Sequence, residues 1–134
     1  MEGQSEYMIS GDELFFFNEK TAALPLYEAF ARRLLAEIDN VMVKVQKTQI
    51  SFSNRHNFAF VSLLPVRKAK ARPETYLTVT FGLRYKKESP RIDMASEPYP
   101  NRWTHHMLIS SVDEIDDELM GWIREAAAFS AGKR

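Results

Sequence analysis

One short segment near the end of the chain holds the densest group of side chains that could do chemistry. It reads Arg102-Trp103-Thr104-His105-His106. An imidazole can act as a general base, and a guanidinium can bind a carboxylate or phosphate with paired hydrogen bonds. On a strand, adjacent side chains point to opposite faces, so His105 and His106 would not share one metal ion. Two interpretations stay open: structural histidines, or one histidine in an anion pocket with Arg102 and Lys47.

Charge is unevenly distributed along the chain, although the formal net charge is zero. Residues 41–91 carry eleven basic and two acidic side chains, a net charge of +9, against −5 for residues 1–40 and −4 for residues 92–134. Cations beside aromatic side chains are typical of surfaces that bind phosphates or single-stranded nucleic acid. Tyr76 and Arg84 therefore join the candidate ligand-binding residues. The alternative is a solvated basic loop and hairpin without a ligand.

An acidic run occupies residues 113–118, with five carboxylates in six positions. Such a run could gather cations, since carboxylate oxygens are the ligands that hard metal ions prefer. It could equally match the positive end of a helix dipole and face water. We expect no metal site and no cofactor.

Several function classes are excluded by what the chain lacks. There is no cysteine, which excludes disulfides, thiolate metal sites and a cysteine nucleophile. The chain contains no phosphate-binding loop, nucleophile elbow or dinucleotide fingerprint. The N-terminus has no apolar run of signal-peptide length, and the longest apolar stretches fall far short of the ~20 residues of a membrane span. We therefore expect a cytoplasmic protein with no membrane partner.

Hydrophobic periodicity predicts the helices. Residues 11–17 suggest a short helix capped by Asp12. Apolar residues three and four apart predict a longer helix over residues 22–38, with Pro25 in its first turn. Ser111 to Glu114 has the form of a capping box, and the helix after it carries an apolar stripe. That stripe comprises Ile115, Leu119, Trp122, Ala126 and Phe129.

Alternating and continuous apolar runs predict the strands between these helices. The expected strands cover residues 41–45, 50–52, 58–64, 75–83, 91–95 and 103–109. A change of phase near residues 47–49 indicates a bulge or a strand break. Residues 97–101 contain two prolines and are expected to form a loop.

Helices flanking a run of strands joined by short connections predict an α+β domain. We expect a loose lead-in over residues 1–10 and a single domain over residues 11–131. Its antiparallel sheet would have four to six strands, with the N-terminal and the C-terminal helix packed on one face. The other face would carry Lys44, Tyr76, Thr78 and Thr80 and be partly open to water.

Several short motifs resemble a small bacterial family known as a domain of unknown function. They are Leu26-Tyr27, Lys47 with Ile50-Ser51-Phe52, Phe58-Ala59, the pattern Arg102-x-Thr-His-His-Met-x-Ile, and residues 114–123. The resemblance covers about residues 12–130. Members are sometimes labelled predicted transport proteins, and the family is distantly similar to a group that includes proposed frataxin-like iron chaperones. The resemblance draws attention to the shared polar positions Lys47, Ser51, Arg102, Thr104, His105 and His106.

These observations predict a non-enzymatic binding module. Its ligand would be an anionic small molecule or a nucleic acid, held on a basic sheet face by Lys47, Ser51, Tyr76, Arg84, Arg102, Thr104, His105 and His106. Two alternatives stay open. One is a homodimeric interaction domain without a small ligand, and the other is a small enzyme that uses His105 or His106 as general base.

Overall fold

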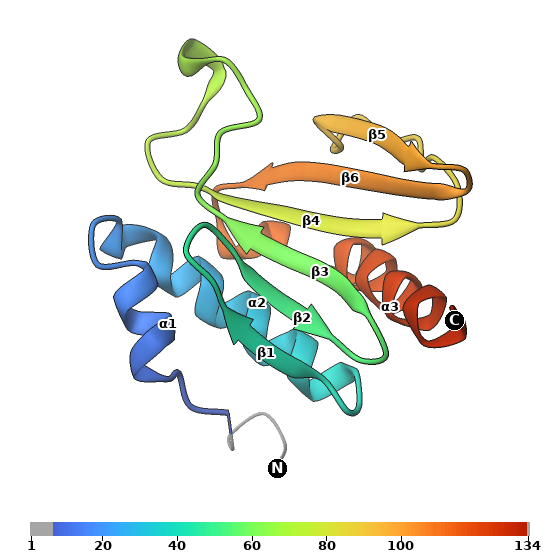
Figure 1. Cartoon of the computed structure of the whole chain (residues 1–134). Coiled ribbons are helices and arrows are strands. Elements are labelled where there is room, and N and C mark those ends of the chain that lie inside the picture. Colours follow the sequence, from blue (N-terminus) through green and yellow to red (C-terminus); the bar gives the residue numbers. More distant parts are fainter. Residues whose placement is uncertain (1–6, 134) are drawn as a thin grey trace.

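A computed structural model describes residues 7–133 of the 134-residue chain. Its helices are α1 (Gly11–Phe16), α2 (Leu24–Glu37) and α3 (Asp117–Gly132), with single 3₁₀ turns at Thr21–Ala23, Ala69–Ala71 and Val112–Glu114. Its strands are β1 (Met42–Val45), β2 (Ile50–Ser53), β3 (Asn57–Ser62), β4 (Leu77–Leu83), β5 (Met94–Tyr99) and β6 (Arg102–Ile109). All pairings are antiparallel, in the order β1-β2-β3-β4-β6-β5. The expected α+β class is confirmed (Figure 1).

Two helix starts differ from the expectation. The Ser10 side chain, not Asp12, caps α1, because it accepts the Glu13 N–H while the Glu13 carboxylate accepts the Ser10 N–H. The capping box at Ser111 opens a 3₁₀ turn, and α3 begins later, with Asp116 as its cap. In both places several acceptor side chains crowd one helix start, and the sequence alone does not rank them.

The sheet departs from the expected strand limits at two points. Residues 46–49 form the turn of a β1–β2 hairpin, with the Gln46 N–H donated to the Gln49 carbonyl at 2.8 Å, so the phase change is a strand break. The fifth strand runs from Met94 to Tyr99, so residues 97–99, expected as loop, are extended. β5 is an edge strand, and an edge tolerates Pro98 because one side of it needs no hydrogen-bond donor.

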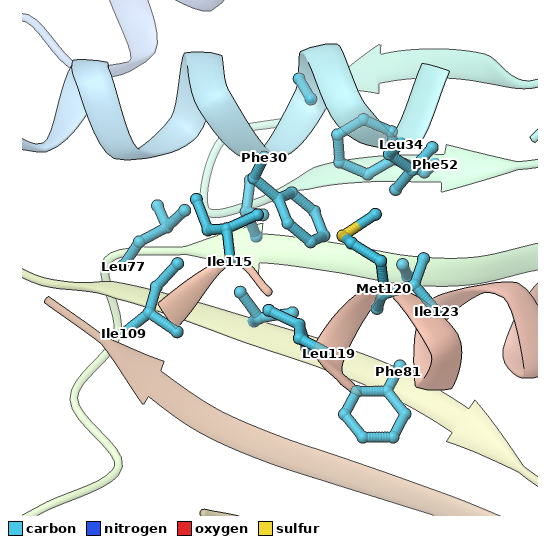
Figure 2. Close-up of a cluster of buried hydrophobic side chains, with 14 of the residues drawn as sticks. Phe30, Leu34, Phe52, Leu77, Phe81, Ile109, Ile115, Leu119, Met120 and Ile123 are labelled. Carbon is cyan, nitrogen blue, oxygen red and sulfur yellow. The ribbon is translucent and has the colours of Figure 1, made fainter. Parts of the chain in front are cut away.

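The core lies between the sheet and the two long helices. In Figure 1, α2 lies behind β1 and β2, and α3 lies behind β3 and β4. Figure 2 shows side chains from both helices meeting the sheet. The labelled residues are Phe30, Leu34, Phe52, Leu77, Phe81, Ile109, Ile115, Leu119, Met120 and Ile123. The placement of an N-terminal and a C-terminal helix on one face is therefore confirmed.

None of the helices in residues 7–133 covers the opposite face, yet not all of its side chains are exposed to water. Lys44 is exposed, whereas Thr78 and Thr80 are buried. The segment after β3 folds back, so that Thr78 donates its hydroxyl to the Leu64 carbonyl at 2.6 Å. Tyr76 donates to the Leu63 carbonyl at 2.8 Å in the same way.

The two ends of the sheet differ in what they bring together. At one end, called here the α3 end, the β2–β3 turn, the end of β4, the start of β6 and the last turn of α3 lie close together (Figure 1). At the other, the loop end, lie the β1–β2 turn and the long β3–β4 connection. This division decides which basic residues can act together.

Candidate anion-binding site

Three cationic side chains converge on one aromatic ring at the α3 end. The Arg84 guanidinium carbon lies 5.2 Å from the centroid of the Phe129 ring, and that of Arg102 lies at 5.7 Å. The Lys133 Nζ lies 5.0 Å from the same centroid. These distances are in the range of cation–π attraction, which contributes about 0.5–1 kcal/mol at an exposed site. Arg84, Arg102, Lys133 and Phe129 are called here the cationic cluster.

Each member of the cluster reaches the ring because of a local feature of the chain. Arg84 directly follows β4, and Arg102 opens β6 after a tight turn in which Asn101 has a φ of 60°. Asparagine adopts this left-handed conformation more readily than most residues. Lys133 directly follows the last residue of α3. Its own backbone is extended, and its side chain reaches the Phe129 ring on the last turn of the helix.

A hydrogen-bonded latch holds the last turn of α3 against the β2–β3 turn. The Ser130 hydroxyl accepts the His56 N–H at 3.1 Å and lies 2.6 Å from the Asn54 Oδ1. The Asn54 amide nitrogen donates to the Ala127 carbonyl at 2.9 Å. The latch fixes where the neighbouring Phe129 ring lies relative to the sheet.

The cluster carries positive charge that no carboxylate among residues 7–133 neutralises. None of Arg84, Arg102 and Lys133 has an acidic partner within 4.0 Å in that part of the chain. Burial, followed by the nearby charge of Arg102, lowers the pKa of the Lys133 ammonium. These two like charges repel each other, so an anion placed between them would be attracted by both, and Arg84 contacts the same ring.

Next to the cluster lies a groove of about 130 Å³. Its lining residues are Asn57, Phe58, Phe60, Gly82, Leu83, Arg102, Trp103, Thr104, Phe129 and Lys133. Gly82 pairs with Thr104 and follows Thr80 by two positions, so it belongs to the helix-free face. Because glycine has no side chain, the face is hollowed at this position.

The predicted site residues divide among different parts of the fold. Arg84, Arg102 and Thr104 come together at the α3 end. Lys47, in the β1–β2 turn, and Tyr76, before β4, lie at the loop end. The expected pocket with both Lys47 and Arg102 is therefore not formed.

Ser51 and His106 lie in the middle of the helix-free face. Ser51 is buried, and its hydroxyl is 3.4 Å from the Lys44 carbonyl. The His106 Nδ1 is 2.8 Å from the Thr80 hydroxyl, opposite it in the β4–β6 ladder. Both side chains are used within the sheet.

His105 points into the core, on the face covered by the helices. Its ring stacks on Phe81 with centroids 5.0 Å apart and planes 9° from parallel. Its Nε2 accepts the Lys87 N–H at 2.9 Å, and its Nδ1 lies 3.4 Å from the Phe81 carbonyl. A neutral ring protonated on Nδ1 satisfies both contacts, so the structure gives His105 no free nitrogen for general-base chemistry.

Comparison with known protein families identifies the family of this chain. The family described as "Domain of unknown function (DUF5655)" matches residues 15–130. The chain belongs to this family. Neither the curated proteins nor the solved structures that were compared gave a match. Within the DUF5655 match lie all the site residues named here except Lys133. The transport label and the similarity to frataxin-like iron chaperones stay predictions.

The carboxylates of the acidic run in this DUF5655 domain cap helix starts or bind arginines. Asp116 and Glu118 bind Arg91, and Asp117 binds Arg33. Glu114 accepts the N–H groups of Ser110 and Ser111. Across residues 7–133, no group of three His, Cys, Asp or Glu side chains lies close enough to hold a metal ion. No helix in that range is both long and apolar enough to cross a membrane.

Phe129 and Lys133 are the members of the site that sequence reasoning missed. Phe129 is the last residue of the predicted apolar stripe of α3, and it is half-buried. Its position at the very end of the stripe, beside Lys133, is the available signal.

The two sheet histidines predict a loss of stability in mild acid. Burial lowers the pKa of His105 and of His106 below the ordinary value. The unfolded chain therefore binds protons at a higher pH than the folded one, and the free energy of unfolding falls as pH drops below about 6.5. Each histidine contributes a slope of at most about 1.4 kcal/mol per pH unit. Urea unfolding from pH 7 to pH 5 measures it. A His105→Gln/His106→Gln variant should show a flatter profile, and an equal slope in this variant would contradict the assignment.

Proposed function

We propose that this domain binds a small anion, bearing a phosphate or carboxylate, at the cationic cluster. The observation that carries the proposal is the convergence of Arg84, Arg102 and Lys133 on Phe129 without a carboxylate partner among the described residues. Guanidinium groups bind such anions with two parallel hydrogen bonds, and a lysine adds a point charge.

The wider distribution of charge favours a local site over a continuous basic face. Of the eleven basic residues in segment 41–91, Arg67, Lys86, Lys87 and Arg91 have acidic partners. Lys47 and the cations of the long β3–β4 connection lie at the loop end, far along the sheet from Arg84. An extended nucleic-acid surface would need these groups on one side, whereas a small anion needs only the cluster.

A titration with inorganic phosphate tests the proposal. Backbone amide chemical shifts, followed by NMR, should move at Phe129, Lys133 and Arg102 with a common dissociation constant. Arg102→Ala and Arg84→Ala should each weaken binding by about tenfold or more, because a hydrogen bond to a charged group contributes about 1.5–3 kcal/mol. Binding should also weaken as salt is raised.

A matched double variant provides the control. Lys68→Ala/Lys70→Ala removes two exposed cations from the loop end and should leave the dissociation constant unchanged. Equal loss of affinity in this control would show that net charge, not the cluster, attracts the anion. Absence of shifts at the α3 end at millimolar phosphate would refute the proposal.

A further inference from the structure

We propose that the ligand is a small phosphate ester carrying a flat aromatic or heteroaromatic ring, which lies in the groove beside the cluster. This inference rests on the proposed function, because the cationic cluster would hold the phosphate. It adds the class of the rest of the molecule.

The groove offers aromatic surface with an open floor. Phe58 is almost fully buried beneath it, whereas Phe60 and Phe129 are half-buried. The floor is open because Gly82 occupies a position where other residues would place a side chain. Stacking of a ligand ring on a protein aromatic contributes about 1–3 kcal/mol, so these surfaces favour a flat partner.

The size of the groove suits one ring. Its volume of about 130 Å³ compares with the roughly 150 Å³ of a protein cavity that accepts benzene. A chain of stacked bases would need a longer channel, which makes a small molecule the better fit. Arg102 and Lys133 line this same groove, so a ring inside it lies next to the phosphate position.

Two polar side chains that line the groove have donors and acceptors available for a ligand. Asn57 and Thr104 both line it, and neither side chain has a hydrogen-bond partner among residues 7–133. An amide can donate and accept, and a hydroxyl can do the same. They could therefore bind the edge of a heteroaromatic ring.

Gly82→Ala is the decisive variant. The backbone at Gly82 does not have a positive φ, and an added Cβ would meet only the Trp103 carbonyl oxygen, at 3.8 Å. Alanine should therefore fold normally while placing a methyl group on the groove floor. Gly132→Ala is the matched control, because a Cβ there, at the end of α3, has no atom within 4 Å.

The experiment compares phenyl phosphate and adenosine monophosphate with methyl phosphate, using calorimetry and amide shifts. We expect the two ring-bearing probes to bind about tenfold or more tightly than methyl phosphate, from one stacked ring. Gly82→Ala and Phe60→Ala should remove that advantage and leave methyl phosphate binding unchanged. Gly132→Ala should change neither.

The outcomes separate the two proposals. If methyl phosphate binds and the ring-bearing probes bind no more tightly, the ring assignment is overturned and the anion site stands. If none of the probes binds, both the ring assignment and the proposed function are overturned. Tighter binding of a short oligothymidylate than of adenosine monophosphate would overturn the assignment to a small molecule.

Discussion

Replacing Glu13 with alanine should lower the free energy of unfolding by about 3–5 kcal/mol, because each buried donor left without its acceptor costs about 1–3 kcal/mol. Glu13 is 3 % exposed. Its Oε2 accepts the hydroxyls of Tyr7, at 2.8 Å, and of Tyr27, and its Oε1 accepts the Ser10 N–H at 2.7 Å. Alanine would leave all three donors without this acceptor, and urea unfolding measures the loss.

The neighbouring acid provides the control for this prediction. Asp12 lies on the same helical turn but is exposed, so Asp12→Ala should change stability little. Glu13→Gln, which keeps the shape and one acceptor, should fall between the two. Burial, followed by the hydrogen bond to Glu13, raises the pKa of both Tyr7 and Tyr27, so both hydroxyls stay protonated donors across the neutral range. A loss no larger for Glu13→Ala than for Asp12→Ala would contradict the buried network.

Replacing Arg91 with alanine should lower the free energy of unfolding by about 1.5–3 kcal/mol, the range for hydrogen bonds to a charged group. The Arg91 guanidinium binds Asp116 at 3.0 Å, Glu118 at 2.8 Å and the Glu114 carbonyl at 2.8 Å, and lies over the Trp122 ring. These contacts join the β4–β5 connection to the start of α3. The Arg91 side chain keeps 22 % of its surface exposed, and Asp116 and Glu118 keep 46 % and 56 %, so water screens these ion pairs and the cost stays below that of a fully buried pair.

Lys86 is a matched control from the same connection. Its ammonium lies 3.9 Å from Glu88, and both side chains are well exposed, so Lys86→Ala should have no measurable effect.

The Arg91 variant should also lose part of the acid sensitivity of the fold. Burial alone would raise the pKa of Asp116, but the Leu119 N–H and Arg91 hold it below its usual value. The stability gained from this carboxylate exists above about pH 4 and is lost as pH falls further. An unchanged thermal midpoint in Arg91→Ala would refute the prediction.

Most of the architecture follows from apolar periodicity. The stripe beginning at Ile115 predicts the buried face of α3, and alternation around Val79 and Phe81 predicts the inward face of β4. The period of apolar residues records which side of an element is buried. It does not record where an element starts, because several acceptors compete at each cap. Ser10 and Asp116 hold those positions instead of the residues first expected.

The site was only partly predictable for a different reason. Arg84, Arg102 and Thr104 were candidates by residue type, and strand order brings them to one end of the sheet. Lys47 and Tyr76 were candidates on similar grounds, but hairpin direction places them at the other end. Which residues share an end depends on the direction and pairing of every strand, and local sequence does not encode that.

The latch at Ser130 restricts what the β2–β3 turn can become. Because Asn54 and His56 both bind the last turn of α3, an insertion or deletion between them would move one anchor away from the helix. Surface hairpins usually accept changes of length, but the length of this turn fixes the position of α3 relative to the sheet. Its spacing sets how far the Phe129 ring stands from Arg84 and Arg102, so the geometry of the cluster depends on a loop that touches none of its charges.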